Sequence, residues 1–157
     1  MINIRRAQKS DIKRIGELLL QVHRVHSKGR PDIFRVGSRK YTDSELEAIL
    51  VDDNTPVFVA VDEANMVVGY AFCAYEEVKN DKSLEDRKSV YIDDLCVDET
   101  LRGKHIGTKL YEYVKEQAAL NGCYHITLNV WSLNESALKF YEKCGMKPLK
   151  ITMEDKL

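Results

Sequence analysis

A short stretch in the second half of the chain reads Arg102-Gly103-Lys104-His105-Ile106-Gly107-Thr108, and it lies between a β-branched run and a segment with helical periodicity. This order predicts a strand, a glycine-containing loop and the start of a helix. The first N–H groups of a helix have no intrahelical partner and carry the positive end of its dipole, so they can bind a phosphate or pyrophosphate. Many such turns only cap a helix, and the motif alone leaves both readings open.

The segments around this loop have clear periodicities. Before it, the run Val90-Tyr91-Ile92-Asp93-Asp94-Leu95-Cys96-Val97-Asp98 is typical of a strand. After it, apolar residues at helical spacing from Ile106 to Ala118 predict a helix that ends at Asn121-Gly122. A later segment, Asn134-Glu135-Ser136-Ala137-Leu138-Lys139-Phe140-Tyr141-Glu142-Lys143-Cys144-Gly145-Met146, predicts a second helix.

Together these segments, from about Tyr91 to Met146, resemble the Gcn5-related N-acetyltransferase (GNAT) family. The family's loop follows Arg/Gln-x-x-Gly-x-Gly/Ala, and its later helix carries Asn-x-x-Ala-x-x-Phe-Tyr-x-x-x-Gly-Phe. Here His105 replaces the first motif glycine and Met146 replaces the final phenylalanine. Histidine is among the residues enriched at positive φ, so the turn can keep its shape despite the change.

The strands and helices along the chain indicate an α/β (α+β) fold with a mixed sheet. The resemblance implies a mostly antiparallel central sheet with helices on both faces, and the length suits one domain over residues 1–157. It also implies an N-acetyltransferase that transfers an acetyl group from acetyl-CoA to a primary amine within a ternary complex. The alternative is a catalytically silent CoA-binding regulatory or interaction protein.

The later helix supplies the expected general acid. Asn134 and Tyr141 are seven residues apart and share a helix face. The resemblance implies that Tyr141 protonates the departing thiolate and that Asn134 hydrogen-bonds the cofactor. A phenol and a thiol have comparable pKa values, so this proton transfer is not steeply uphill. Two alternatives stay open: Tyr141 as a core aromatic beside Phe140, and Asn134 as a helix cap.

The strand before the loop supplies the expected base. The resemblance implies an acidic residue here, with Asp93 the first choice and Asp94 the second, acting directly or through water. Strict alternation puts Asp93 on one face with Tyr91, Leu95 and Val97, and Asp94 on the other with Ile92 and Cys96, unless a bulge shifts the register. A solvated or ion-paired role for either aspartate is the alternative.

The resemblance also implies the groups that hold acetyl-CoA. Backbone groups of Leu95, Cys96 and Val97 would bind the pantetheine and the thioester carbonyl. The loop would bind the pyrophosphate, with Arg102 and Lys104 adding charge-assisted contacts, and Lys143 would reach the adenosine phosphate. The order Gly-x-x-x-x-Gly-Lys-Ser/Thr of nucleotide triphosphatases is absent, which favours CoA.

Composition excludes several other functions. The 24 Lys and Arg residues balance 25 Asp and Glu residues, so the net charge of -1 argues against a general nucleic-acid or membrane-surface binder. No apolar run could span a bilayer and the N-terminus lacks a signal-peptide core, so we expect a cytoplasmic protein. The four cysteines, Cys73, Cys96, Cys123 and Cys144, lack metal-site spacing and are expected to be buried free thiols, with Cys96 the best placed for a catalytic alternative.

The other elements follow from periodicity and turn residues. We expect strands at Ile2–Arg6, Val57–Val61, Met66–Glu76 and Ile126–Val130, helices from Ser10 or Asp11 and from Thr42 or Asp43, exposed connections at His26–Lys40 and Lys79–Lys88, and a final strand within Lys147–Leu157. In the resembling family such connections cover the acceptor site. Arg30, Phe34 and Arg35 could select an acidic or aromatic acceptor, or could simply be solvated. The resemblance also suggests a homodimer, and the amine stays unidentified.

Overall fold

A computed structural model describes all 157 residues. Five strands form one sheet whose spatial order follows the sequence, β1-β2-β3-β4-β5. The strands are β1 (Asn3–Arg6), β2 (Val57–Val61), β3 (Val67–Val78), β4 (Arg87–Val97) and β5 (His125–Leu128). The first four pair antiparallel and β5 pairs parallel to β4. The mixed, mostly antiparallel sheet is confirmed.

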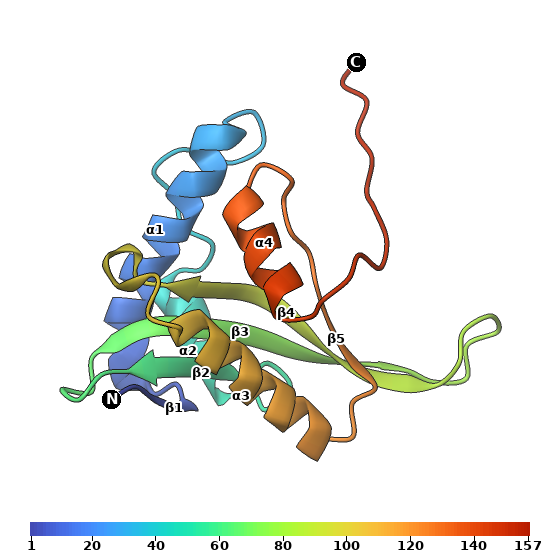
Figure 1. The fold of residues 1–157 in the computed structure, drawn as a ribbon, viewed down its shortest axis with the longest axis horizontal. Coiled ribbons are helices and arrows are strands. Elements are labelled where there is room, and N and C mark those ends of the chain that lie inside the picture. The colour runs from blue at the N-terminus through green and yellow to red at the C-terminus, as the bar shows by residue number, and fades with distance from the viewer.

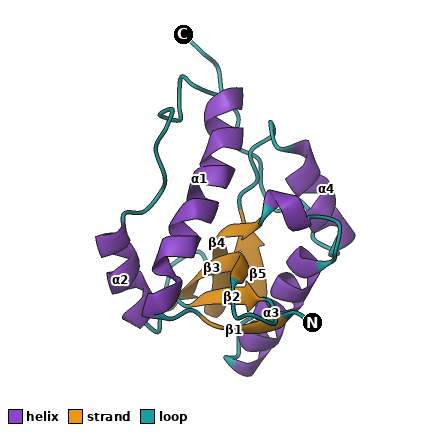
Figure 2. Ribbon diagram, turned by 90° about the vertical axis from the view of Figure 1, so that its left-hand side faces the viewer, coloured by secondary structure: helices purple, strands orange, loops and turns teal.

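Helices cover both faces of this sheet. They are α1 (Ile12–Gly29), α2 (Asp43–Val51), α3 (Ile106–Leu120) and α4 (Glu135–Lys143), with 3-10 turns η1 (Lys9–Asp11) and η2 (Glu99–Leu101). Figure 1 shows α3 and α4 in front of the sheet, and Figure 2 shows α1 and α2 on the opposite side from them. The arrangement therefore has three layers, as predicted.

Two apolar cores lie on the two sides of the sheet. The core under α1 and α2 includes Leu18, Leu46 and Tyr70, and the core under α3 includes Leu110 and Val114. Every residue of β2 is buried, because the strand is covered on both faces and its run of apolar residues serves both cores. The sheet is thus held between two cores, with β4 near the edge that carries β5.

A bulge in β4 changes which side chains face which core. Phe72 of β3 pairs with Asp94, and the next residue, Cys73, pairs with Ile92, so Asp93 is the extra residue. Ile92 packs into the core under α3, while Cys96 packs into the core under α1. The exception to strict alternation, a bulge that shifts the register, is therefore what occurs, and it places these two residues on opposite faces. Beyond the bulge β4 no longer pairs with β5, because the last paired residues of the two strands are Ile92 and Leu128.

Several boundaries differ from the sequence-based ones. Helix α1 continues through His26 to Gly29, so the connection that follows it begins later than expected. Strand β4 already starts at Arg87, because this segment pairs with the end of β3 and is not part of the exposed loop. Strand β5 covers 125–128 where 126–130 was expected, and it ends where β4 turns away at the bulge.

The C-terminal segment is a larger correction. Residues 147–157 form no strand and are all exposed. They run outside the sheet, and ion pairs from Arg30 to Glu154 and from Lys156 to Asp32 hold the end of the segment near the end of α1. The expected cysteine environments are only partly right: all four thiols are free, but Cys123 and Cys144 are half-buried while Cys73 and Cys96 are buried. No helix is long and apolar enough to span a membrane.

Candidate active site

The site is built at the part of β4 that has no neighbouring strand. Residues 93–97 pair with β3 on one side only, since β5 stops pairing at Ile92. Strand interiors leave N–H and C=O groups directed to both sides, so this segment keeps backbone groups free on its second side. The predicted contact segment Leu95–Val97 therefore presents an open peptide edge.

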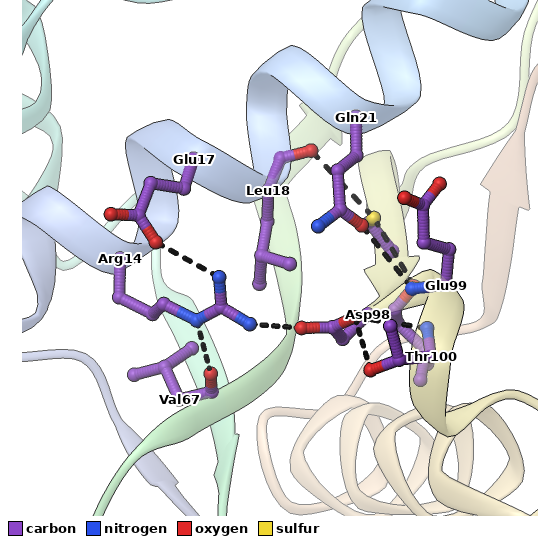
Figure 3. A network of polar contacts seen from close by, with 10 residues as sticks. Arg14, Glu17, Leu18, Gln21, Val67, Asp98, Glu99 and Thr100 are labelled. Atoms are coloured by element: carbon purple, nitrogen blue, oxygen red, sulfur yellow. Dashed lines mark hydrogen bonds and ion pairs between the residues drawn. The ribbon is translucent and has the colours of Figure 1, made fainter.

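A polar network fixes the end of this strand (Figure 3). Arg14 of α1 forms an ion pair with Asp98, donates from Nε to the Val67 carbonyl at 3.0 Å, and donates to Glu17 at 2.9 Å. Asp98 in turn accepts from the N–H and hydroxyl of Thr100 at 3.0 and 2.9 Å. The Thr100 N–H lowers the pKa of Asp98, against the opposing effect of burial, and Arg14 adds to the lowering. The network joins α1, β3 and η2 at the entrance of the glycine loop.

The loop ends in a left-handed turn with free donors. Gly103 has φ +83° and His105 has φ +61°, so the histidine adopts the conformation that the motif glycine would supply. His105 is the N-cap of α3, and no side chain caps the helix. The first backbone bond there runs from the Lys109 N–H to the His105 carbonyl, at 3.1 Å, which leaves the preceding N–H groups without protein partners. Together with exposed Arg102 and Lys104, this turn is suited to an anion.

Helix α4 closes against the start of α3 through a glycine. A Cβ atom at Gly107 would lie 3.2 Å from Cζ of Phe140 and 3.6 Å from Cγ2 of Val97. The absence of a side chain therefore lets α4 approach both the loop and the open segment of β4. The sequence motif contains this glycine, but only the packing shows what it allows.

Tyr141 lies beside this contact without being part of the core. Phe140 packs against the core under α3, whereas Tyr141 belongs to neither core, and the two rings are 5.1 Å apart in an edge-to-face arrangement. Burial raises the pKa of Tyr141, and the Asp94 carboxylate raises it further, so the phenol stays protonated at neutral pH. Its hydroxyl has no hydrogen-bond partner in the protein. A protonated phenol without a protein acceptor keeps its O–H available to donate to a ligand.

The other predicted residues of α4 have simpler surroundings. Asn134 is the N-cap: its side-chain oxygen accepts from the Ala137 N–H at 3.2 Å and from the Ser136 hydroxyl at 3.1 Å. The capping alternative is thus the observed role of its oxygen, which leaves only the amide NH₂ for a ligand. Lys143 is exposed in the last turn. Cys96 is buried, which raises its pKa to about 12 and keeps its sulfur as an unreactive thiol.

The bulge brings both aspartates to the side of the sheet that α1 covers. Asp93 accepts from the Tyr41 hydroxyl at 2.6 Å and pairs with the Lys40 ammonium at 2.8 Å. Asp94 accepts from the Tyr70 hydroxyl at 2.7 Å. Burial raises the pKa of Asp94 to about 6, with the neighbouring Asp93 charge adding to the effect and Tyr70 opposing it. One carboxylate is thus ion-paired, and the other is poised to exchange a proton near neutral pH.

Three aromatic side chains form a cluster at the C-terminal end of α1, and the sequence predicted only one of them, Phe34, as a candidate. The Phe34 ring stacks on His26 at 4.9 Å and meets Trp131 edge-on at 4.8 Å. Burial lowers the pKa of His26, and the charges of His23 and Lys40 lower it further, which favours the neutral imidazole in this cluster. Among the residues proposed to select the acceptor, Phe34 is therefore part of a packed aromatic cluster.

The remaining two selectivity candidates are arranged differently. Arg30 is bound bidentately by both Asp32 and Glu154, at 2.8 to 3.0 Å, and so is already neutralised. Arg35 is exposed, and its backbone carbonyl contacts Nε2 of His23 at 2.6 Å. Neither guanidinium faces the aspartates through a contact in the structure. Tyr41, Tyr70 and Lys40 were missed because no local pattern signals partners so distant in sequence.

Comparison with known proteins places this geometry in a family. Over 66 residues the chain is 38% identical to glucosamine 6-phosphate N-acetyltransferase of Arabidopsis thaliana, covering 42% of each protein. Over 87 residues it is 31% identical to thialysine N-epsilon-acetyltransferase of Mus musculus, covering 55% of this chain and 48% of that one. The matched region is thus less than half the length of these curated relatives.

Solved structures agree with this placement. Mutant forms of the protein BH1408 from Bacillus halodurans superpose with a TM-score of 0.95 at 35% identity, covering 99% of both chains. The Arabidopsis thaliana glucosamine-6-phosphate N-acetyltransferase gives 0.71 at 28% identity, covering 99% of this chain and 98% of that one. The sequence pattern of the acetyltransferase (GNAT) family matches residues 19–146, which include α4, the glycine loop and the open segment of β4. With the motif, the sheet and the family pattern in agreement, this chain belongs to the GNAT acetyltransferase family.

Proposed function

We propose that this protein is an N-acetyltransferase that transfers the acetyl group of acetyl-CoA directly to a primary amine, with residues 1–157 acting as one domain. The observation that carries the proposal is the meeting of three elements at Gly107: an uncapped anion-binding turn, the open edge of β4 and the helix that bears Tyr141. A thioester with a pyrophosphate at one end and a reacting carbonyl at the other needs these groups in this order.

The residues present fit acetyl-CoA. The N–H groups of the turn bind the pyrophosphate, with Arg102 and Lys104 adding charge, and Lys143 in the last turn of α4 binds the adenosine phosphate. The peptide edge at Leu95–Val97 bonds to the pantetheine amides and donates to the thioester carbonyl, where negative charge develops during the reaction. Bound acetyl-CoA supplies an activated acetyl group. The protein must position the amine, accept its proton and protonate the departing sulfur.

Tyr141 serves as the general acid. The amine nitrogen attacks the thioester carbon, the C–S bond of the resulting adduct breaks, and the sulfur leaves with the bonding electron pair. Tyr141 then gives its phenolic proton to that thiolate. The burial that raises the pKa of the Tyr141 phenol also raises the pKa of a thiol in the same surroundings. The two pKa values therefore stay comparable, and the proton transfer is not steeply uphill.

The two aspartates divide the work on the acceptor. The sequence favours Asp93 as the base, but the raised pKa of Asp94 supports the reverse order, with Asp94 accepting the amine proton directly or through water. Asp93, held by Tyr41, is the anchor for the incoming ammonium. Its present partner, Lys40, is an aliphatic primary ammonium and occupies the position in which we place the acceptor.

The relatives support an amine acceptor without identifying it. Their names specify glucosamine 6-phosphate in one case and the epsilon nitrogen of thialysine in the other. We propose a small molecule or peptide that carries an aliphatic amine for Asp93 and a body that packs on the cluster of Phe34, His26 and Trp131. The homodimer and the cytoplasmic location stay predictions from the sequence.

Calorimetric titration with acetyl-CoA, with ATP as a control, tests the cofactor site. Micromolar affinity for acetyl-CoA, about 8 kcal/mol, with no response to ATP is the expected result. Release of free thiol in the presence of an amine panel then tests turnover. Binding without thiol release from any amine would favour the catalytically silent CoA-binding alternative, and absence of binding would refute the site itself.

A further inference from the structure

The connection between α1 and α2 is held against the protein on both sides of Lys40. It contains no helix or strand, and Figure 2 shows it running back beside α1. Arg39 lies so close to α1 that a Cβ atom at Gly16 would overlap its guanidinium. On the other side, the Tyr41 hydroxyl donates to Asp93 at 2.6 Å. The backbone at Lys40 is therefore fixed through both of its neighbours, which limits where its side chain can reach.

Lys40 differs from the other lysines that form ion pairs. Its ammonium lies 2.8 Å from Oδ1 of Asp93, and its side chain is 45% exposed. The other three ion-paired lysines are 71% to 83% exposed, and their carboxylates belong to α2, β3 and the connection after α1. These three are Lys9, Lys79 and Lys156. Lys40 alone thus presents an ion-paired amine to a carboxylate of the candidate active site.

The amine of Lys40 also lies near the place where we expect the acetyl group. Asp93 is the bulged residue of β4, and the open peptide edge begins two residues further on, at Leu95. Two residues of a strand span about 7 Å. The proposed base, Asp94, lies between them in the strand. Lysine has a flexible four-carbon stem, so rotation about its bonds brings Nζ from Asp93 towards a carbonyl bound at this edge.

We propose that Lys40 is an internal acceptor, so that the protein acetylates this side chain on itself when no external amine is bound. This inference rests on the proposed function, because the acetyl group comes from acetyl-CoA at the candidate site. A tethered amine acts at a high effective concentration, which a free amine must match in order to compete. Without an external acceptor, the lysine has no competitor for the position beside Asp93.

The step uses the groups assigned to the external acceptor. The Lys40 ammonium gives one proton to the Asp94 carboxylate, and the free amine attacks the thioester carbon. A C–N bond forms, the C–S bond breaks, and the sulfur leaves with the bonding electron pair. Tyr141 gives its proton to the sulfur and regains one from the new amide nitrogen, while Asp94 releases its proton to water. The products are acetylated Lys40, CoA and one proton, and the uncharged amide no longer pairs with Asp93.

Mass spectrometry of the full chain tests this reaction directly. The protein is incubated with acetyl-CoA and no amine, and acetylation is measured at Lys40 and at Lys82, an exposed lysine between β3 and β4. We expect Lys40 to be acetylated at least tenfold faster than Lys82, because only Lys40 is held beside the proposed base. Uncatalysed acylation by a thioester would not favour Lys40 in this way. Equal rates at the two lysines would therefore overturn the proposal.

A mixture of two variants shows whether the transfer occurs within one chain. Lys40→Arg keeps the catalytic groups but offers no amine at this position, and Tyr141→Phe keeps Lys40 but lacks the proton donor. After both are mixed with acetyl-CoA, we expect the Tyr141→Phe chain to be acetylated at Lys40 at least tenfold more slowly than the wild type. Wild-type acetylation of that chain only in the presence of Lys40→Arg would show transfer between chains and refute an internal acceptor.

The wild-type preparation also separates this inference from the proposed function. Acetyl-CoA binding is measured by calorimetry, and thiol release is measured with an amine panel that includes n-butylamine, the free equivalent of a lysine side chain. Binding and thiol release together with unmodified Lys40 would refute the internal acceptor and leave the proposed function standing. Absence of acetyl-CoA binding would refute both.

Discussion

Gly107 on α3 and Phe140 on α4 are in direct contact, and a Cβ atom at Gly107 would lie 3.2 Å from Cζ of the ring. The two residues are far apart in the sequence, yet their contact determines how closely α4 approaches the anion-binding turn and the open segment of β4. A single absent side chain thus allows α4 to pack closely against the start of α3.

A branched side chain at this contact should open the site. We expect Gly107→Val to weaken acetyl-CoA binding by at least tenfold, because the added methyl groups displace Phe140 and push α4 away from the start of α3. Ala119→Val introduces the same side chain at an exposed position of α3 and serves as the control. Titration calorimetry measures both affinities, and an unchanged affinity for Gly107→Val would refute the role of this contact.

Removal of the Tyr141 hydroxyl should affect turnover and not binding. We expect Tyr141→Phe to lower kcat by about 10- to 100-fold while the acetyl-CoA affinity changes less than about twofold. The hydroxyl has no protein partner to lose, so stability should stay nearly constant. Tyr124→Phe, at a tyrosine that is 78% exposed, is the matched control. Equal loss of kcat in both variants, or none in either, contradicts the acid role.

The ionisation of Asp94 should appear in the pH profile of the reaction. Because its pKa is raised to about 6, kcat/KM should rise with pH through that value as the base becomes available. The acceptor amine also loses its proton as pH rises, so the profile should be measured with two acceptors of different amine pKa. The limb that stays near pH 6 with both acceptors belongs to the protein, and Asp94→Asn should abolish it.

Asp94 should also reduce stability at neutral pH. Its folded pKa of about 6 exceeds the unfolded value near 4, so the native state binds more protons between them and stability falls as pH rises through this range. We expect Asp94→Asn to raise the unfolding free energy by about 1 to 3 kcal/mol at pH 8 and by little at pH 4. Urea unfolding at both pH values measures this, with exposed Asp155→Asn as the control. An equal gain in unfolding free energy at pH 4 and pH 8 would exclude the ionisation of Asp94 as the cause.

Asp98 should have the opposite effect on stability. Asp98→Ala removes the cap on Thr100 and leaves Arg14 without its buried partner, so we expect a loss of about 2 to 4 kcal/mol at pH 7. The folded pKa of Asp98 is lowered, so its contribution is full above about pH 4 and is lost as pH falls through the folded value. The difference in unfolding free energy between the wild type and Asp98→Ala should therefore become smaller in acid. The control variant Glu99→Ala should show no comparable loss of stability at pH 7.

Local sequence was sufficient to predict the features that depend on the residues of one segment alone. The turn at His105 is left-handed as the motif requires, and the capping side chain of Asn134 and the helix carrying Tyr141 follow from residues within a few positions. The α3 spacing likewise identified its buried face. In each case backbone conformation and helix spacing act over one or two turns, so the information is contained in the segment.

Contacts between distant segments required the tertiary structure. The bulge at Asp93 depends on the register of β4 against β3, and it reverses the facing of Ile92 relative to Cys96. The bond from Tyr41 to Asp93 and the ion pair between Arg14 and Asp98 join residues dozens of positions apart. The alternating residues of 147–157 predict a strand, and this prediction is wrong: the segment pairs with no other strand, and local alternation cannot supply a partner.

The sequence by itself thus determined the family through its motifs, and it also determined the left-handed turn at His105 and the helix that carries Tyr141, because short-range periodicity and capping specify those two features. Only the tertiary structure decided which aspartate has the raised pKa, since desolvation depends on everything packed around a carboxyl group and not on its neighbours in the chain. The same holds for the C-terminal segment: a strand forms only where another strand offers hydrogen-bond partners, and the alternation within the segment does not specify that partner.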